Sequence, residues 1–323
     1  MQCGLQGSFV IQKRMDGVIT QELEFENLIT NNGLDYAGQD GVYSGTDATG
    51  SSAWANVMVV GSGNTPPTNG DSQLQAIIGS AINVNNSTWS SVYTARAGAV
   101  PAYYTLTQSV VVPMNTRLGN WAEIGIGKTA TQLFSRALIK DTNGTPIVLT
   151  VVANEEVTIT YRLKVYYSNT QTTEVINYAG TDYTFVSRLN KLGSGGTSSV
   201  NTPSGYSIFG GYNGLYSDTG RGQTSTFGAV SSIGTEYDSS ITGTLIATKN
   251  GTTADAYTLG SYVRRWTATF TPTEGVSATP IQAFSSRLGE SGSSVVTSIS
   301  PSVVKLNTHT LTIKFGVTWG RYV

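Results

Sequence analysis

The chain has 323 residues, of which only 12% are charged, and its formal net charge is −1. Its 19 Lys and Arg residues form no basic patch, which argues against a nucleic-acid-binding protein. One Cys and one His exclude an intramolecular disulfide and a metal site built from His and Cys.

The length favours two domains, each large enough to bury a core without covalent cross-links. The first ten residues contain no basic segment followed by an apolar stretch of signal-peptide length, and no lipid-attachment pattern precedes Cys3. No window approaches the roughly 18 continuous apolar residues that a membrane-spanning helix needs. We therefore expect synthesis and folding in the cytosol, without a membrane span.

Alternation of apolar and polar residues predicts strands along most of the chain, because successive side chains of a strand point to opposite faces. In chain order the predicted strands are Gly7–Lys13, Val18–Asn27, Asn56–Gly61, Tyr103–Val112, Glu123–Gly127, Ile147–Val152, Val157–Tyr166, Thr244–Lys249, Val263–Thr271, Val295–Ile299 and Leu311–Trp319. Turn signals such as Asp16-Gly17, Asn143-Gly144 and Asn250-Gly251 separate them.

Helices are scarce in the pattern. The best candidate is Asn31–Ala37, where Asn side chains can cap the start, and residues Gln73–Ile78 are a candidate for one further turn. The chain offers no room for the crossover helices of a parallel sheet. The sequence therefore predicts an all-β protein made of antiparallel β-sandwiches.

A long phrase occurs twice, at residues 133–167 and 283–321, and aligning the two places Phe134 near Phe284. Two interpretations are open. Any two sandwiches share Val/Thr alternation and Gly/Ser turns, whereas a duplicated domain would place two tandem, divergent β-sandwiches in one chain. The polar stretch Ser168–Thr173 resembles a linker, so the predicted domains are residues 1–168 and 169–323. The second would carry long Gly/Ser/Tyr-rich loops over residues 191–226.

The residues that could carry catalysis are few. We expect His309 at the end of a sheet on its apolar face and Cys3 in a mobile terminus, neither with the partner that a general base or a nucleophile requires. Paired carboxylates could hydrolyse glycosides, but alternating Glu residues on a strand are typical of its solvated face. These carboxylates are Glu22, Glu24, Glu26, Glu155 and Glu156.

Two apparent ligand motifs fail on spacing. The stretch "GIGKTA" at 125–130 lacks the earlier glycine and the following helix of a phosphate-binding loop, and Asp40 and Asp47 are wrongly spaced for a calcium loop. We therefore predict a non-enzymatic protein with no catalytic residue, cofactor or metal.

Aromatic residues in loop-like contexts could stack on sugar rings or anchor a protein interface. Trp54 and Trp89 lie in such contexts. The candidate contact residues for a glycan or a protein partner are Tyr206, Tyr212 and Tyr216.

Four phrases carry a resemblance to a known family. They are "FENLITNNGLDYAG" (25–38), "VVGSGNTPPT" (59–68), "NWAEIGIG" (120–127) and the 133–167 phrase, in that order. Together they resemble tailed-bacteriophage virion proteins that serve as tail, tail-fibre or other structural components. The similarity covers roughly residues 8–167; the second half lacks the "GSGNTPPT" phrase and echoes the terminal strands alone.

The resemblance implies a β-sandwich structural protein of the virion, made and assembled in the cytoplasm of the bacterial host. A tail or baseplate component is the primary expectation. A capsid decoration, collar or head-fibre protein is the alternative, and a module that binds host-surface glycan is a further one. The implied partners are copies of the chain itself and neighbouring virion proteins, with host glycan in the further alternative.

Overall fold

The structure is a computed structural model that describes residues 2–38, 55–84, 89–94, 97, 100–168, 170–190, 224–233, 241–249, 253–287 and 294–322. This part of the chain is mostly β, with 62% strand and one helix, α1 (Asn31–Gly38). The strands form several sheets, one of them curled into a half-barrel. The prediction of a β-rich fold is confirmed.

The largest sheet has eight strands and contains strands from both halves of the sequence. Its order is β17 (Thr253–Ala254), β18 (Val263–Phe270), β21 (Leu311–Arg321), β1 (Gln2–Met15), β12 (Glu156–Tyr167), β7 (Tyr103–Val112) and β6 (Ser90–Thr94), with β2 (Val18–Glu26) also paired to β1. All its pairings are antiparallel except that between β1 and β21, which is parallel. Strand β1 therefore joins the beginning of the chain to its last strand.

Three smaller sheets complete the described fold. The five-stranded sheet runs β3 (Leu28–Ile29), β10 (Gln132–Leu138), β9 (Glu123–Thr129), β4 (Val57–Gly61) and β5 (Ile82–Asn83). The two-stranded sheet pairs β11 (Leu149–Val151) with β8 (Gly119–Trp121). The six-stranded sheet runs β13 (Thr172–Tyr178), β14 (Thr181–Asn190), β20 (Ser294–Val303), β19 (Ile281–Arg287), β15 (Thr224–Ser232) and β16 (Thr242–Lys249).

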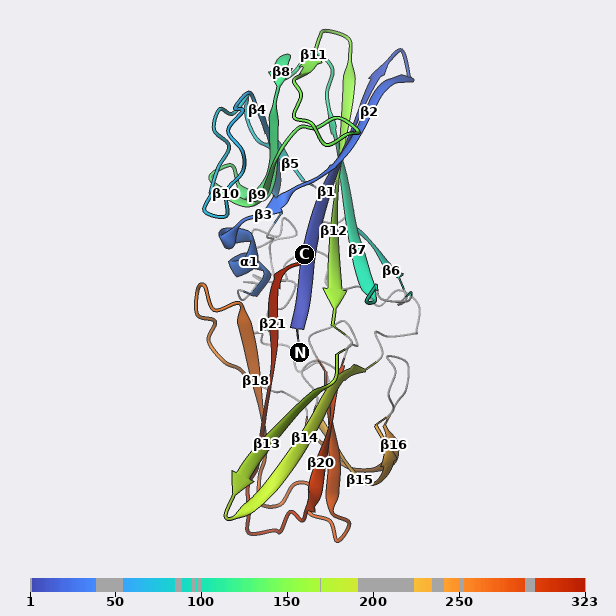
Figure 1. Cartoon of the computed structure of the whole chain (residues 1–323), viewed down its shortest axis with the longest axis vertical. Helices are drawn as coiled ribbons and strands as arrows, with labels where there is room; N and C mark the ends of the chain where they lie inside the picture. The colour runs from blue at the N-terminus through green and yellow to red at the C-terminus, as the bar shows by residue number, and fades with distance from the viewer. Residues whose placement is uncertain are drawn as a thin grey trace.

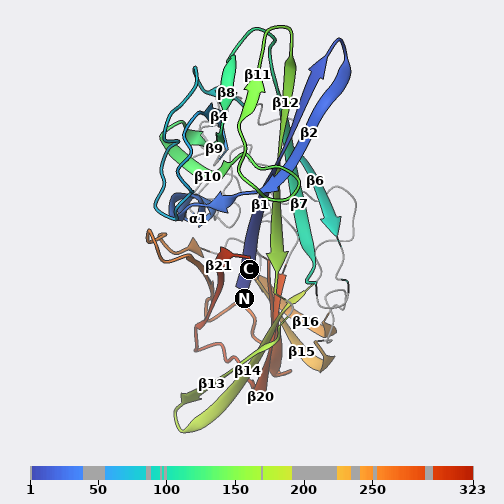
Figure 2. The same cartoon turned by 45° about the horizontal axis from the view of Figure 1, so that its top comes forward.

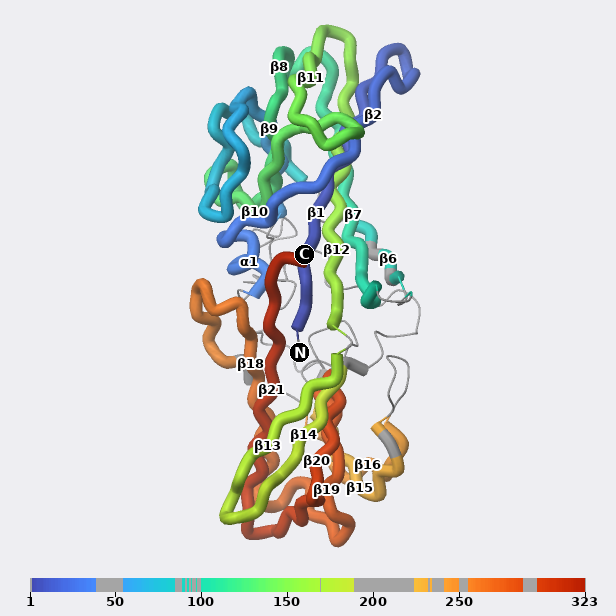
Figure 3. Tube along the Cα trace, viewed as in Figure 1, coloured from blue at the N-terminus to red at the C-terminus, as the bar shows by residue number. Residues whose placement is uncertain are grey.

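The molecule is elongated, and its two termini lie near the middle of its length (Figure 1). The smaller sheets of the first half occupy one end, the six-stranded sheet occupies the other, and α1 lies nearer the middle (Figure 3). The turned view shows the β13–β14 hairpin extending from that second end (Figure 2). Strands β1 and β21 pair side by side near the middle of the molecule, Gln2–Leu5 with Thr318–Arg321, so the large sheet contains strands from both halves of the molecule.

Period-2 alternation builds the main core. Along β1 the odd residues Leu5, Phe9 and Ile11 are buried, and β12 buries alternate residues in the same way. Each fully buried large apolar side chain contributes about 1.5–3 kcal/mol. A smaller core around Ile281 and Phe284 lies between the six-stranded sheet and β21.

The predicted strands are all present, and their ends agree within two residues except that β1 begins five residues earlier and β20 ends four residues later than predicted. Ten described strands were not predicted: β3, β5, β6, β8, β10, β13, β14, β15, β17 and β19. In β10 all but the first residue are buried, so the strand shows no alternation, and β13 begins within the polar stretch that resembles a linker, at Thr172. Residues 73–78 form bends and an isolated bridge at Ile77 instead of a helical turn.

Helix α1 begins at Asn31 as predicted, but its capping residue is the one before the predicted asparagines. The side-chain oxygen of Thr30 accepts a hydrogen bond from the Gly33 N–H at 3.0 Å, so Thr30 and not an Asn caps the helix. A Cβ on Gly33 would collide with the Phe134 carbonyl oxygen. The glycine in "TNNGLD" therefore lets the helix lie directly against β10.

Candidate functional site

The phrases that carry the family resemblance meet in space around two buried charges of the five-stranded sheet. Glu123 from "NWAEIGIG" lies on β9, and Arg136 from the 133–167 phrase lies on the adjacent β10. The "GSGNTPPT" segment folds over this pair, and Thr30 from the first phrase donates a hydrogen bond to the Leu133 carbonyl at 2.8 Å. We call Glu123, Arg136 and Asp71 the charged clamp.

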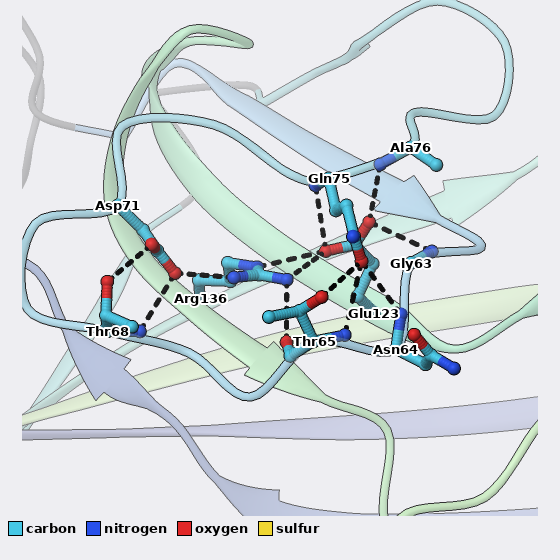
Figure 4. Close-up of polar contacts among 9 residues, drawn as sticks. All are labelled: Gly63, Asn64, Thr65, Thr68, Asp71, Gln75, Ala76, Glu123 and Arg136. Atoms are coloured by element: carbon cyan, nitrogen blue, oxygen red, sulfur yellow. Dashed lines mark hydrogen bonds and ion pairs between the residues drawn. The ribbon is translucent and has the colours of Figure 1, made fainter.

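Glu123 is the centre of the clamp, with no exposed side-chain surface. Its Oε1 accepts hydrogen bonds from the N–H groups of Gly63 at 3.1 Å and Ala76 at 2.8 Å, and its Oε2 accepts one from Gln75 N–H at 3.1 Å. Arg136 Nε and Nη2 also donate to Oε2, at 2.9 and 2.7 Å (Figure 4). The carboxylate thereby binds both ends of the loop between β4 and residue 76.

Arg136 uses the rest of its guanidinium to hold the middle of the same loop. Its Nη2 donates to the Thr65 carbonyl at 2.9 Å, and its Nη1 pairs with Asp71. Asp71 in turn accepts hydrogen bonds from the Thr68 hydroxyl at 2.6 Å and the Thr68 N–H at 3.0 Å. Glu123 thus holds the two ends of the loop, and Arg136 holds it between them at Thr65 and Asp71.

Electrostatics favour the ionised state of the outer acid. Partial burial raises the pKa of Asp71, but the hydrogen bonds from Thr68 and the charge of Arg136 outweigh it, so the pKa lies below its ordinary value. Every carboxylate oxygen and every guanidinium nitrogen of the clamp has a partner within the protein. The arrangement therefore acts as a structural support for the loop.

Glycine is required where the loop passes the carboxylate. A Cβ on Gly63 would collide with Glu123 Oε1 and with the Gln75 side chain. The Gln75 side-chain oxygen also accepts N–H bonds from Asn64 and Thr65, each at 3.2 Å. These contacts explain the glycine at position 63, and they hold the start of the loop against Gln75 and Glu123.

A second cluster joins the C-terminal strand to the first half. Trp319 is buried and its Nε1 donates to the Leu34 carbonyl of α1 at 2.7 Å. Arg321 Nε donates to the Ile29 carbonyl at 2.6 Å, and the Tyr322 ring stacks on Tyr166 with centroids 3.7 Å apart. We call Trp319, Arg321 and Tyr322 the C-terminal latch. With the short parallel pairing of β1 and β21, it fixes the last strand to the first half.

Helix α1 contributes a further contact to this junction. Asp35 accepts a hydrogen bond from the Tyr257 hydroxyl at 2.8 Å and one from the Gly260 N–H at 2.7 Å. Tyr257 also stacks on Trp319. Burial and the neighbouring Asp35 raise the pKa of Tyr257, so its hydroxyl stays protonated and donates this hydrogen bond at any physiological pH.

The predicted contact residues Tyr206, Tyr212 and Tyr216 lie outside the described residues, and so does Trp54. Trp89 is described and is buried against Tyr161, so it offers no ring for a sugar to stack on. Lys128 and Thr129 of "GIGKTA" belong to strand β9, so no phosphate-binding turn forms there.

The carboxylates on β2 are solvated, as their alternation predicts. Glu22, Glu24 and Glu26 are exposed and accept hydrogen bonds from Gln12, Arg162 and Gln6, respectively. Glu155 is buried in an ion pair with Lys13, 2.8 Å from Nζ to Oε1, while Glu156 lies nearer the surface, 3.8 Å from Arg14.

Two expectations about reactive residues were wrong. His309 is exposed in the turn before β21, because the strand begins two residues later at Leu311, and its Nδ1 contacts the Thr308 hydroxyl. Cys3 is buried within β1 between Tyr167 and Trp319, since the latch closes over the start of the chain. Burial raises the pKa of its thiol, which makes it a poor nucleophile.

The clamp was not predicted, although two of the quoted phrases contain Glu123 and Arg136; Asp71 lies outside all four. A Glu and an Arg inside the apolar runs "WAEIGIG" and "LFSRALI" are the signal that was available, because charged residues are almost never fully buried unless they are paired.

Comparison of the chain with known protein families, with curated proteins and with solved structures finds no match in any of the three. Among the residues that the structure describes, no helix is long and apolar enough to cross a bilayer. The same residues contain no group of three or more His, Cys, Asp or Glu side chains arranged to hold a metal ion.

Proposed function

We propose that this chain is a non-enzymatic structural protein of a tailed-bacteriophage virion, a tail or baseplate component that works by assembling with copies of itself and with neighbouring virion proteins. The observation that carries the proposal is the convergence of the four resembling phrases on the charged clamp. Those phrases supply buried, fully bonded charges that hold a surface loop, which is the role expected of a structural family motif.

Surface chemistry supports the same proposal. The low charge of the chain limits long-range repulsion between neighbouring copies. Large apolar side chains are exposed on several strands, among them Val92, Val111, Val175, Tyr178 and Leu245, each with more than half of its surface accessible. Exposed apolar side chains on strands are typical of surfaces that form protein–protein interfaces.

We also propose that the two halves are tandem, divergent copies of one β-sandwich. The five-stranded sheet has the order β3–β10–β9–β4–β5, and the six-stranded sheet has the order β14–β20–β19–β15–β16 after its edge strand β13. In the large sheet, β12–β7–β6 of the first half is matched by β21–β18–β17 of the second. Every one of these pairings is antiparallel, which supports a shared topology.

The opening hairpins of the two halves match as well. Strands β1 and β2 are joined by Asp16-Gly17, with φ of 51° and 79°, and β13 and β14 are joined by Ala179-Gly180, with φ of 50° and 81°. The strand order puts β21 in the place of β12, which agrees with the alignment of the repeated phrases at residues 133–167 and 283–321. It puts β19, which carries Phe284, in the place of β9 and not of β10, which carries Phe134. An experimental structure whose halves superimpose in this order would support the duplication; a different order would reject it.

Immunogold electron microscopy of phage particles with antibody against the recombinant chain tests the virion proposal. Gold on tails or baseplates is the expected result. Gold on heads or necks would favour the capsid decoration, collar or head-fibre alternative instead. Unlabelled particles in a lysate that still contains the intact antigen would reject the virion proposal. The glycan-binding alternative rests on Tyr206, Tyr212 and Tyr216 and stays a prediction.

A further inference from the structure

One edge of β21 is paired along only part of its length. On one side β21 pairs with β18 from Leu311 to Thr318. On the other side it pairs with β1 from Thr318 to Arg321. Over residues 311–315 this second edge has no strand partner among the described residues.

Strand β13 is a second exposed element. It pairs with β14 on one side, and its other edge is the end of the six-stranded sheet. All seven residues of the strand are exposed, with Val175 at 58% and Ile176 at 46%. An exposed edge strand with β-branched apolar side chains is a template for pairing with another strand.

The first half shows what fills the equivalent edge. Strand β1 pairs with β12 from Cys3 opposite Tyr167 to Arg14 opposite Glu156, which covers almost all of β12. Strand order equates β12 with β21, and the matching two-residue turns equate β1 with β13. The strand expected beside the open part of β21 is therefore a β13.

The β13 of the same chain is held elsewhere. In the first half, the chain changes sheets at Asn27, between β2 and β3, where the Asn27 N–H bonds to Gly7 of β1 and its side chain reaches Ser135 of β10. Strand β14 has no such break: Thr181–Ser187 pair with β13 while Thr184–Asn190 pair with β20. Strand β13 thus stays in the six-stranded sheet, and reaching β21 of its own chain would break the pairing of β14 with β20.

We propose that β13 of one copy pairs antiparallel with residues 311–315 of β21 in a second copy. This inference rests on the proposed assembly function and on the proposed duplication, and it names the contact between copies. We transfer the register of β1 against β12 to β13 against β21, using the matching turns to align β1 with β13 and the strand order to align β12 with β21. This places Ile176 opposite Leu311, Val175 opposite Thr312, and Thr173 opposite Lys314. Because the two surfaces differ, each copy offers one of each, and the contact continues head to tail into a ring or a filament.

Cysteine cross-linking between two preparations tests the contact. Thr173→Cys is introduced in one preparation and Lys314→Cys in the other; both side chains are exposed, and the native Cys3 is buried and does not compete. The mixture is oxidised gently, and disulfide-linked dimers are measured on non-reducing gels and by mass spectrometry. The matched control mixes Thr173→Cys with Thr244→Cys, an exposed position on the opposite edge strand β16.

We expect at least about tenfold faster dimer formation than in the control, because strand pairing holds the two thiols at a high effective concentration. Dimer formation no faster than in the control overturns the proposal. A single chain that carries both Thr173→Cys and Lys314→Cys is oxidised at high dilution, where dimers are suppressed. A disulfide within that chain, together with no cross-link in the mixture, would also overturn the proposal. Circular dichroism of each variant, compared with the unmodified chain, checks folding.

The contact and the virion role fail separately. Gold-labelled particles without cross-linking would reject the contact and leave the proposed function in place. Cross-linking of the purified chain with unlabelled particles would reject the virion role and leave the contact in place.

Discussion

Arg136 Nη2 lies 2.7 Å from Glu123 Oε2 across two neighbouring strands, and 4% and 0% of these side chains are exposed. A buried pair of this kind contributes little net stability over an apolar pair, but removing one partner leaves the other charge without compensation. Here the same carboxylate also satisfies three loop N–H groups, so the clamp couples the loop to the core.

Replacing Glu123 should therefore be costly. We expect Glu123→Ala to lower the free energy of unfolding by about 3–5 kcal/mol, because Arg136 loses its buried partner. Urea denaturation followed by circular dichroism measures the loss. The matched control is Glu22→Ala, an exposed carboxylate, for which a change within about 0.5 kcal/mol is expected. Equal effects for both variants would contradict the role given to the clamp.

Two Gly→Ala variants should distinguish the steric effect of an added Cβ from the effect of replacing glycine on the backbone. We expect Gly63→Ala to destabilise the protein by about 1–3 kcal/mol, since the added Cβ meets Glu123 and Gln75. Gly70→Ala is the control, because a Cβ there has nothing within 4 Å. Thermal unfolding of the two variants compares them, and loss of stability in Gly70→Ala alone would refute the packing argument.

The latch should hold the two halves together. Trp319→Ala is expected to cost about 3–5 kcal/mol, as other large buried aromatics do. Trp319→Phe keeps most of the packing and loses the hydrogen bond to Leu34, so a cost of about 1–3 kcal/mol is expected. Hydrogen exchange should rise at Gln2–Leu5, which pair with β21. Tyr178→Ala, at an exposed ring, is the control; unchanged exchange at Gln2–Leu5 in Trp319→Ala would count against the latch.

Stability should fall in acid partly through Glu155. Burial raises the pKa of Glu155, but the hydrogen bonds from Lys13 and the Val152 N–H outweigh it, so the folded-state pKa lies below the ordinary 4.5. A lowered folded-state pKa gives stability that is full above the unfolded pKa and is lost as the pH falls through the folded one. Glu155→Gln should be less stable than the unmodified chain at pH 7, and the difference should shrink below about pH 4.5 in urea titrations. A constant difference across this range would contradict the linkage.

Glu174 lies on β13 between Thr173 and Val175, two residues that the proposed contact uses. In the transferred register it lies opposite Ile313, where a buried carboxylate weakens pairing. We expect Glu174→Val to strengthen association of the purified chain about tenfold or more, measured by sedimentation velocity over a range of concentrations. Glu22→Val, at an exposed position on β2, is the control. Equal association of the two variants would argue against this register.

The clamp and the strand pairings differ in how far the sequence predicts them. The alternation in β2, β7 and β12 and the Asp16-Gly17 turn predict those elements closely, because side-chain period and turn chemistry are local properties. Strand β10 escapes the same reasoning, since a strand buried on both faces has no alternation. The phrases around Glu123 and Arg136 stand out in the sequence, but their meeting depends on which strands become neighbours.

The sequence by itself determined that the chain is rich in strands, where eleven of the 21 described strands lie, which of their faces are buried, and where one short helix forms. The tertiary structure alone decided that β1 lies between β12 and β21, that Trp319 reaches helix α1, and that the loop before Ala76 closes over Glu123. The physical reason is that strands pair through backbone N–H and C=O groups that every residue except proline carries in full. A side-chain pattern therefore selects a face for burial, while the choice of neighbour emerges from packing the whole chain.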